Sequence, residues 1–417
     1  MTFSALQAIK SLAVSALLIP ERLRNGVTYN PFSDKVTQDP YPVYAELRER
    51  SPVHHSRLMD AIVVSRYGDV DRILRDHARF SVNPDLRTSR KARYKPTPEE
   101  RSILFIDPPD HTRLRSLVNK AFTRSAINTL EPRIREIMKI LLDDIKNHAG
   151  FDLMQAVAIP LPVIVIAEML GIPQEDRAQF RVWSNQRARL LEPMLTRAER
   201  KTANEASKQL SDYFLSIIKS RQGEPRDDIL TRLVQAEEQG DTLSELEMLN
   251  MLRLLLIAGN ETTTNLIGNG MLALLRHPDQ LQALRDDPGL IPAAVDELLR
   301  YDSPVQMTLR CAVEDCDIDG MAVRAGQDVI LLGGSANRDP DAFENPDQLD
   351  FNRQKQDHIS FGRDIHYCLG AGLERLEGRI AFEMLLERFD SLRQLTARAE
   401  FRYSIVLRGL TSLPVGV

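Results

Sequence analysis

Helical periodicity dominates the pattern of hydrophobic and polar positions. Between Ser125 and Asn147, apolar residues recur three or four positions apart, as they do on one face of a helix. These residues are Leu130, Ile134, Ile137, Met138 and Leu141. Pro160 to Leu170 is mostly apolar and is followed by Gly171, a residue typical of the position just after a helix. Lys201 to Ser220 is amphipathic. The pattern predicts a helix over each of these segments.

Strand patterns are fewer and shorter. Ala61 to Ser65 and Asp328 to Leu332 are apolar runs that contain valine and isoleucine, which favour strands. Asp317 to Val323 is predicted to form a hairpin around Asp319-Gly320, a pair that suits a tight turn. The chain shows no fixed-period repeat and no linker between independent units. We therefore expect a mainly α protein, with a large helical body and a minor β-rich part.

The N-terminal segment, residues 1–25, contains an apolar run from Ser11 to Pro20. The run is shorter than the roughly 20 apolar residues that a membrane-spanning helix needs. Lys10 is the single basic residue of its n-region, and no convincing cleavage site follows. We expect a helical or flexible segment without a transmembrane anchor, followed by one domain over residues 26–417. The alternative is a peripheral contact with a membrane surface.

Composition narrows the class of protein. The 417 residues are 43% hydrophobic, which is ample for a large core. The net charge of -5 gives no basic excess for binding nucleic acid. The three cysteines, Cys311, Cys316 and Cys368, make a poor disulfide framework and suit a reducing, cytoplasmic location.

A predicted helix before Pro278 has an unusual middle. Ser244 and Glu247 form a capping-box start, and the leucines that follow make the helix apolar on most sides. Its centre, Ala258 to Asn265, contains a glycine and three threonines, which weaken a helix interior. The acid Glu261 is unfavourable in a buried helix unless it has a partner or a task. Such local disagreement indicates a functional site.

The segment from Phe361 to Gly370 surrounds the third cysteine. Cys368 lies just before a strongly helical stretch, and a helix N-terminus stabilises a thiolate. Glycines on either side allow a flat cofactor to approach the backbone. A lone cysteine is more often a small buried hydrophobic residue. The segment alone leaves both interpretations open.

With this segment, nearly the whole sequence resembles the bacterial soluble cytochrome P450 family of haem-thiolate monooxygenases. The resemblance implies that Cys368 is the thiolate ligand of a haem b iron, a donor that favours cleavage of the O–O bond. It implies that Phe361 shields this ligand and that His366 contacts a haem propionate. A position usually held by glycine is Asp364 here. Aspartate tolerates a left-handed backbone, so the turn remains possible.

Two further motifs follow the order of the family. Glu297 and Arg300 are three residues apart on a predicted helix and can pair. Alone they would be a solvated surface pair; in the family the pair is buried and braces the cysteine segment. The third partner, often an arginine, corresponds to Gln348, which brings no charge. We therefore expect a weakened network at that corner.

The unusual helix resembles the family's oxygen-activating groove. Ala258 and Gly259 would leave room for dioxygen, and the acid–alcohol pair Glu261 and Thr262 would relay protons to it. Without the cysteine segment, these polar residues would be equally well explained as a polar stripe that packs against a neighbouring helix.

Basic residues match the family's haem-propionate contacts. His111 and Arg115 lie four apart at a helix start, and Arg310 precedes the predicted hairpin. Arginine suits bidentate binding of carboxylates. Each residue alone would be a surface charge; Arg113 is a weaker candidate.

The resemblance implies electron transfer from separate proteins, a ferredoxin and an NAD(P)H-dependent reductase. We expect no flavin-like or ferredoxin-like appendage after Cys368, and the sequence shows no second cysteine cluster for iron–sulfur ligands. Four basic residues would attract an acidic carrier, unless they are an ordinary solvated face. They are Arg113, Lys120, Arg363 and Arg375.

The implied pocket above the haem is apolar, which favours a terpenoid, steroid or fatty acyl substrate. Its lining residues would be Leu255, Ala258, Met307, Ile405 and Val406. A basic stretch would bind a substrate carboxylate or be solvated charge. It contains Arg87, Arg90, Lys91, Arg93 and Lys95.

Two other functions fit the same fold. One is a peroxygenase driven by hydrogen peroxide, and the other is a haem sensor or binder without turnover. Glu261 and Thr262 argue against both, because neither needs a proton relay.

Overall fold

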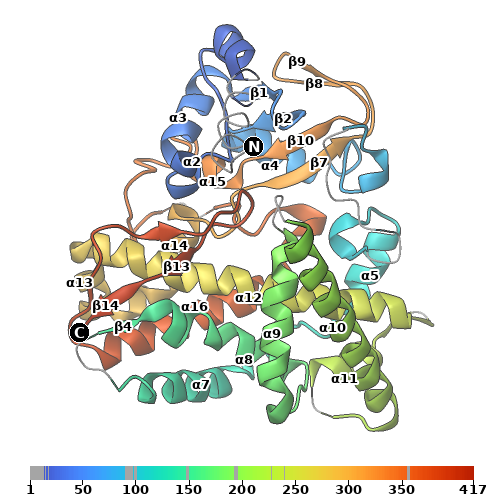
Figure 1. The fold of residues 1–417 in the computed structure, drawn as a ribbon, viewed down its shortest axis with the longest axis vertical. Helices are drawn as coiled ribbons and strands as arrows, with labels where there is room; N and C mark the ends of the chain where they lie inside the picture. Colours follow the sequence, from blue (N-terminus) through green and yellow to red (C-terminus); the bar gives the residue numbers. More distant parts are fainter. Residues whose placement is uncertain are drawn as a thin grey trace.

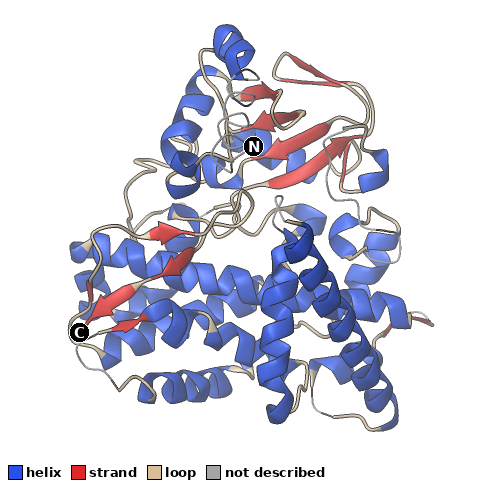
Figure 2. Cartoon of the chain, viewed as in Figure 1, coloured by secondary structure: helices blue, strands red, loops and turns tan. Residues whose placement is uncertain are grey.

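The chain folds into a large helical body and a smaller β-rich part (Figures 1 and 2). The computed structural model describes residues 14, 16, 18–89, 97, 101–146, 150–191, 196–226, 228–238, 240–354 and 357–417. The division into two parts is the one that the sequence pattern predicts. Across the described residues, no helix combines the length and the apolarity needed to cross a membrane.

A five-stranded sheet forms the β-rich part. Its order is β1-β2-β10-β7-β3, with β10 parallel to β2 and the other neighbours antiparallel. The strands are β1 (Val53–Ser56), β2 (Ala61–Val64), β10 (Asp328–Leu331), β7 (Thr308–Ala312) and β3 (Phe80–Ser81). The central strands β2 and β10 are buried throughout, which explains their continuous apolar sequence. Both match the strands predicted there.

Short helices flank this sheet. They are α2 (Asp34–Gln38), α3 (Tyr41–Arg50), α4 (Tyr67–Arg75) and α15 (Gly333–Ala336). Two hydrophobic clusters, separate from that of the helical body, hold the sheet and these helices together. The strands β8 (Cys316–Ile318) and β9 (Met321–Val323) form the predicted hairpin, with positive φ at Asp319 and Gly320 as a tight turn requires.

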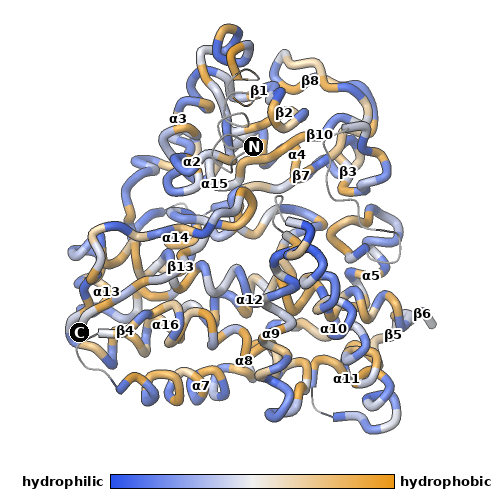
Figure 3. Tube along the Cα trace, in the orientation of Figure 1, coloured by the Kyte–Doolittle hydropathy of each residue, from blue (hydrophilic) through white to orange (hydrophobic). Residues whose placement is uncertain are grey.

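The helical body contains the other α-helices, among them the two longest of the described chain. The α-helices of the body are α5 (Asp110–Asn119), α6 (Arg124–Asn128), α7 (Glu131–Asp143), α8 (Pro160–Met169), α9 (Arg177–Ala188), α10 (Arg197–Gly223), α11 (Ile229–Val234), α12 (Glu245–Arg276), α13 (Pro278–Asp286), α14 (Ile291–Tyr301) and α16 (Ala371–Arg388). Figure 3 shows hydrophobic and hydrophilic residues alternating along α7, as expected for a helix with one buried face.

Small strand pairs complete the body. They are β4 (Phe151–Asp152), β11 (Arg393–Gln394) and β14 (Pro414–Gly416) in one sheet, β12 (Glu400–Phe401) with β13 (Leu410–Ser412), and β5 (Glu237–Glu238) with β6 (Asp241–Thr242). The C-terminus lies beside β4 and β14 at one edge of the helical body (Figure 1).

The helix α12 organises the body. It packs against α8, α16, α10 and α14 (Figure 1). Ser244 and Glu247 form the predicted capping box, and the helix ends at Arg276, just before Pro278. The position of α12 brings residues from distant parts of the chain to its middle.

Two predicted helices differ in their limits. The segment from 125 to 147 is two helices, α6 and α7, because Pro132 lacks the N–H that a helix interior needs and fits only the first turn of α7. The helix predicted from Lys201 starts earlier, at Arg197, where Thr196 and Glu199 form a capping box. The helix α8 ends as predicted, with Gly171 in a left-handed conformation (φ 65°).

The predictions for the N-terminal apolar run fall mostly outside the described residues. Residues 18–25 are helical, and Glu21 from this helix is buried against His54 at 3.2 Å. The described residues before residue 26 are therefore helical, which is one of the two forms expected for this segment. The single domain over 26–417 remains a prediction.

Candidate active site

The cysteine segment folds into a tight loop that ends where α16 begins. The backbone N–H of Cys368 donates to the carbonyl oxygen of Phe361 over 2.9 Å, which closes the loop. Gly362 and Asp364 both have left-handed backbones, with φ of 70° and 54°. The prediction that Asp364 replaces a glycine by adopting this conformation is confirmed.

The side chain of Cys368 borders open space. Part of its surface stays accessible although it packs against the helical core. A Cβ placed on Gly370 would meet only the Cys368 sulfur, at 4.0 Å. Phe361 is buried, and the guanidinium of Arg375 lies 4.5 Å from its ring centre. The loop therefore leaves room beside the sulfur.

Burial dominates the acidity of this cysteine. It raises the pKa of the Cys368 thiol to about 12, and the nearby Glu374 acts in the same direction. The backbone at Gly370 lowers the pKa, as expected at a helix start, but this effect is smaller. The helix N-terminus therefore acts on Cys368 in the predicted direction, but burial outweighs it. A bound metal cation would supply the missing positive charge, because a cation deprotonates a thiol that coordinates it.

The helix α12 becomes accessible at its middle. Ala258 is exposed and Gly259 and Thr262 are half-buried, whereas residues 263–274 are buried. The hydroxyl oxygen of Thr262 lies 2.9 Å from the carbonyl oxygen of Ala258 and 3.1 Å from Glu374 Oε2. Because Glu374 also acts on Cys368, the middle of α12 and the cysteine loop are neighbours.

Glu261 turns toward the C-terminal segment. Its carboxylate forms an ion pair with Arg402 at 2.8 Å, and Arg402 also donates to the side chain of Asn265 at 2.7 Å. The Glu261 side chain is 14% exposed and that of Arg402 is 37% exposed. No sequence motif marks Arg402, since the pair joins residues 141 positions apart, from Glu261 to Arg402. The acid therefore points along a path toward solvent.

Four basic side chains gather near the cysteine loop. The rings of His111 and His366 are 4.3 Å apart, and within the described part of the chain the buried atoms His111 Nδ1 and His366 Nε2 have no hydrogen-bond partner. Burial lowers the pKa of His366 to about 3, and the neighbouring charges of His111, Arg310 and Arg115 add to this shift.

The two arginines show the same lack of a counter-charge. Burial lowers the pKa of Arg310 to about 10 and also lowers the pKa of Arg115. Among the described residues, Arg310 donates to the hydroxyl of Thr308 and to the carbonyl of Leu309. Neither arginine forms an ion pair with any residue that the structure describes. Buried cations and unpaired imidazole nitrogens indicate a site for an anionic group.

The predicted pair Glu297 and Arg300 is buried in α14. The guanidinium of Arg300 contacts both carboxylate oxygens of Glu297, at 2.7 and 2.8 Å. A second guanidinium, that of Arg353, lies 3.2 Å from the same carboxylate. Gln348 is exposed and contributes only its backbone carbonyl. The prediction of a weakened network around Glu297 and Arg300 is therefore wrong, because Arg353, five residues after Gln348, supplies the third charge.

Asn337 connects this pair to the cysteine loop. Its carbonyl accepts from Arg300 at 2.8 Å. Its side chain accepts from the N–H of Ile359 and donates to the hydroxyl of Ser360, both at 2.8 Å. These residues come directly before Phe361, so the buried ion pair holds the start of the loop. The sequence carried no signal for Asn337.

The predicted substrate-pocket residues lie in two groups. Met307, Ile405 and Val406 belong to one hydrophobic cluster beside the sheet, and the backbones at 306 and 406 are hydrogen-bonded. Leu255 belongs to the cluster of the helical body. A common pocket for all four remains a prediction.

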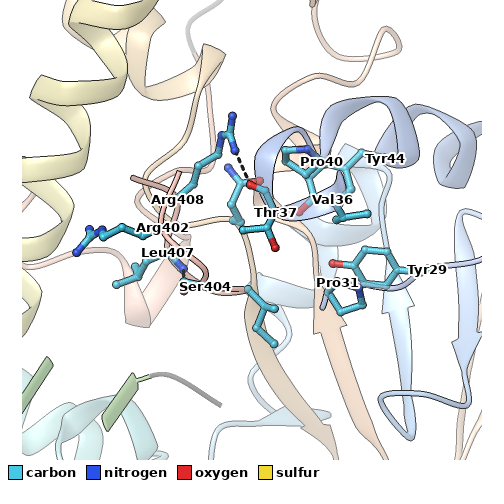
Figure 4. A pocket seen from close by; sticks show the side chains of 12 residues that line it. Tyr29, Pro31, Val36, Thr37, Pro40, Tyr44, Arg402, Ser404, Leu407 and Arg408 are labelled. Atoms are coloured by element: carbon cyan, nitrogen blue, oxygen red, sulfur yellow. Dashed lines mark hydrogen bonds between the residues drawn. The ribbon is translucent and has the colours of Figure 1, made fainter. Parts of the chain in front are cut away.

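A separate hollow lies between α3 and the segment from Arg402 to Arg408 (Figure 4). Its volume is about 20 Å³, room for about one water molecule. Thr37 Oγ1 and Gln306 Oε1 are buried there without a hydrogen-bond partner in the described part of the chain. This hollow is too small for an organic substrate.

Part of the predicted steering surface is internal. Arg363 is buried and pairs with Asp71 at 2.8 Å, so it cannot attract a carrier. Arg113 pairs with Asp241 at 3.2 Å and with Glu247, which neutralises it and agrees with its weak candidacy as a propionate contact. Of the four residues, Lys120 is exposed and Arg375 is partly exposed while paired with Asp296.

The basic stretch predicted to bind a carboxylate is only partly described. Arg87 makes two 2.7 Å contacts with Asp328 and is therefore occupied. Arg90, Lys91, Arg93 and Lys95 lie outside the described residues.

Comparison with known proteins identifies the family. The cytochrome P450 family profile matches residues 41–288 and 289–402. This chain belongs to the cytochrome P450 family. It is 41% identical over 407 residues to the polyketide biosynthesis cytochrome P450 PksS of Bacillus subtilis, covering 93% of this chain and 98% of PksS. The PksS structure superposes with a TM-score of 0.87 over 93% of this chain and 99% of PksS. The fold predicted from the motifs is confirmed.

Two other relatives carry informative names. The vitamin D(3) 25-hydroxylase of Pseudonocardia autotrophica is 42% identical over 395 residues, 92% of this P450 and 95% of the relative. The structure of P450BioI in complex with an acyl carrier protein that bears hexadec-9Z-enoic acid is 38% identical, with a TM-score of 0.85. It covers 92% of this chain and 99% of P450BioI.

Family membership makes this chain a haem-thiolate monooxygenase, and its residues fit that cofactor. The unpaired nitrogens of His111 and His366 lie beside the buried Arg310. Imidazole N–H groups and a guanidinium would suit the two propionates of a haem, because both can donate hydrogen bonds to a carboxylate. The accessible Cys368 and the accessible middle of α12 border the same region.

We predict that Arg353→Gln destabilises the fold by about 2–3 kcal/mol, because Glu297 then keeps only one of its two buried guanidinium partners. The measurement is urea unfolding of the haem-loaded protein. Gln348→Ala is the matched control and should stay within about 0.5 kcal/mol of the unmodified protein, since its side chain is exposed. Equal losses in the two variants would show that Gln348, as first predicted, is the third partner.

Proposed function

We propose that this P450 inserts one oxygen atom from O2 into a lipophilic small molecule of terpenoid, steroid or fatty acyl type. Electrons come from a ferredoxin and an NAD(P)H-dependent reductase. The observation that carries the proposal is the accessible middle of α12, where Ala258 is exposed and Thr262 contacts Glu374, the acid that acts on Cys368. The names of the relatives refer to a polyketide, to vitamin D(3) and to a fatty acid on a carrier protein, which supports a lipophilic substrate.

The haem would be held from several elements. Cys368 would bind the iron, and Phe361 and Gly370 would contact the haem from the cysteine loop. The propionates would contact His111, Arg115, Arg310 and His366. Ala258 and Gly259 would contact the haem from α12. When bound, the haem-thiolate iron supplies the binding and reductive activation of dioxygen.

The chain's own contribution to this chemistry is proton handling. Thr262 holds a proton at Oγ1, at the accessible face of α12. Glu261, one residue earlier, is tied to the partly exposed Arg402, so its carboxylate can exchange protons with water at the C-terminal segment. An acid and an alcohol in series are the groups that proton delivery to a reduced oxygen molecule needs.

The remaining residues would shape and hold the site. Leu255, Met307, Ile405 and Val406 would provide apolar surface for the substrate. The buried pair Glu297 and Arg300 would keep the cysteine loop in place through Asn337. Lys120 and Arg375 remain the candidates for contact with an acidic electron carrier, because Arg363 is internal.

Replacing the ligand tests the centre directly. In Cys368→Ser, the reduced carbon monoxide complex should lose the Soret shift typical of a thiolate ligand, because serine oxygen is not a soft donor. The measurement is the absorption difference spectrum of the purified protein. Cys316→Ser is the matched control, since Cys316 lies in β8 of the β-rich part. An unchanged spectrum in Cys368→Ser would refute the ligand assignment.

Oxygen-driven and peroxide-driven turnover separate the proposed function from its alternatives. Thr262→Ala should lower product formation with a surrogate ferredoxin system and NAD(P)H by roughly 100-fold, the lower end of what a proton relay contributes. Peroxide-driven turnover should change little, because peroxide already carries the reduced oxygen. If the unmodified protein formed product with peroxide but none with the ferredoxin system and NAD(P)H, it would be a peroxygenase. No product under either condition would favour a haem sensor or binder.

The substrate class is tested by binding spectra. Lipophilic acids, neutral polycyclic compounds and acyl groups on a carrier protein should be compared for a shift of the haem spin state. We expect at least one of these classes to produce the shift at micromolar concentration. Response to polar metabolites alone would contradict the proposed pocket.

A further inference from the structure

Two buried acids on α16 face the oxygen-activating part of α12. Glu374 is 6% exposed and Glu377 is 1% exposed. They are one helical turn apart, and each interacts with a threonine of α12: Glu374 with Thr262 and Glu377 with Thr263. Neither acid forms an ion pair with any residue that the structure describes. Two carboxyl groups without a counter-charge therefore lie beside the proposed relay.

The nearest cation is committed elsewhere. Arg375 follows Glu374 in the sequence, but its Nε donates to Asp296 at 2.7 Å and its Nη1 donates to the hydroxyl of Tyr367 at 3.2 Å. The other titratable groups close to Glu374 are Cys368 and Glu377, and both would be negative if charged. A buried carboxylate without a cation is strongly disfavoured. The surroundings therefore favour a neutral Glu374.

The hydrogen-bond geometry at Thr262 gives independent support. Its hydroxyl oxygen lies within hydrogen-bond distance of two oxygens, the Ala258 carbonyl and Glu374 Oε2. A threonine hydroxyl carries one proton and can donate to only one of them. Both contacts become hydrogen bonds when Glu374 carries a proton: its O–H donates to Thr262, and Thr262 donates to Ala258. Burial acts in the same direction, because it raises the pKa of Glu374 to about 7.

We propose that Glu374 is a positioning residue for oxygen activation, which as a neutral carboxylic acid donates to Thr262 and fixes the direction of its hydroxyl. The inference rests on the proposed function, in which Thr262 handles the proton. Under this proposal, α16 takes part in the reaction through Glu374, in addition to packing behind the cysteine loop. Glu377, one turn further on, forms its hydrogen bond with Thr263 and is therefore not assigned this role at Thr262.

The protonation state is tested without turnover. Infrared spectra of the haem-loaded protein at mildly acidic pH should contain the carbonyl stretch of a neutral carboxylic acid that Glu374→Gln removes. Raising the pH above about 7 should weaken this band as the acid ionises. Glu383→Gln is the matched control on the same helix: Glu383 forms an ion pair with Arg379 at 3.0 Å, so its loss should leave the band intact. A spectrum that Glu374→Gln does not change would overturn the proposal.

The positioning role is tested by coupling, the product formed per NAD(P)H consumed. Glu374→Ala should lower coupling about tenfold, as expected for the loss of one hydrogen bond, while KM for the substrate stays unchanged. Glu374→Gln should restore coupling, since its amide N–H can still donate to Thr262. Equal loss in both variants, or full coupling in Glu374→Ala, would overturn the donor role.

The failure of the proposed function would look different. If Thr262→Ala remained fully coupled, the proton relay itself would be wrong, yet the infrared band assigned to Glu374 would persist. A normal thiolate-type carbon monoxide spectrum in both Glu374 variants shows that they fold and bind haem, which keeps the comparison valid.

Discussion

The buried ion pair between Glu297 and Arg300 is the interaction on which the site depends. Both side chains are almost completely buried, and a charge there is tolerable only with its partner in place. Arg353 adds a second guanidinium to the same carboxylate, and the carbonyls of Asn337 and Pro346 accept from Arg300. The pair therefore fixes several loops that have no regular secondary structure of their own.

The connection from this pair to the cysteine is short. Asn337 accepts from Arg300 and holds the backbone at Ile359 and Ser360, immediately before the loop that closes on Cys368. Asp296, beside Glu297, contacts His358 at 3.1 Å and Arg375 at 2.7 Å. One turn of α14 thus holds both the segment that leads into the loop and the helix that leaves it. A ligand presented on an irregular loop needs such support to keep its geometry.

Desolvation is the second constraint, and it acts with opposite signs in different parts of the site. Around His366 it disfavours positive charge, and around Cys368 and Glu374 it disfavours negative charge. A bound haem would bring anionic propionates to the basic cluster and a metal cation to the thiol, so one cofactor would compensate both groups. Glu374 lacks such a partner, and a proton is what keeps it neutral.

The sequence by itself determined the family, the helical body with its β-rich part, and the identity of the chemical groups, because motifs such as Phe361 to Gly370 and Ala258 to Thr262 are contiguous. It also indicated the left-handed turn at Asp364, since backbone preference is a local property. Only the tertiary structure decided which residues complete these groups. Arg353 in place of Gln348, Arg402 at Glu261, Asn337 behind the loop and Glu374 at Thr262 are contacts between distant segments. Burial, which raises the pKa of the Cys368 thiol and removes Arg363 from the surface, depends on the packing of the whole chain and has no signature in any short stretch of it.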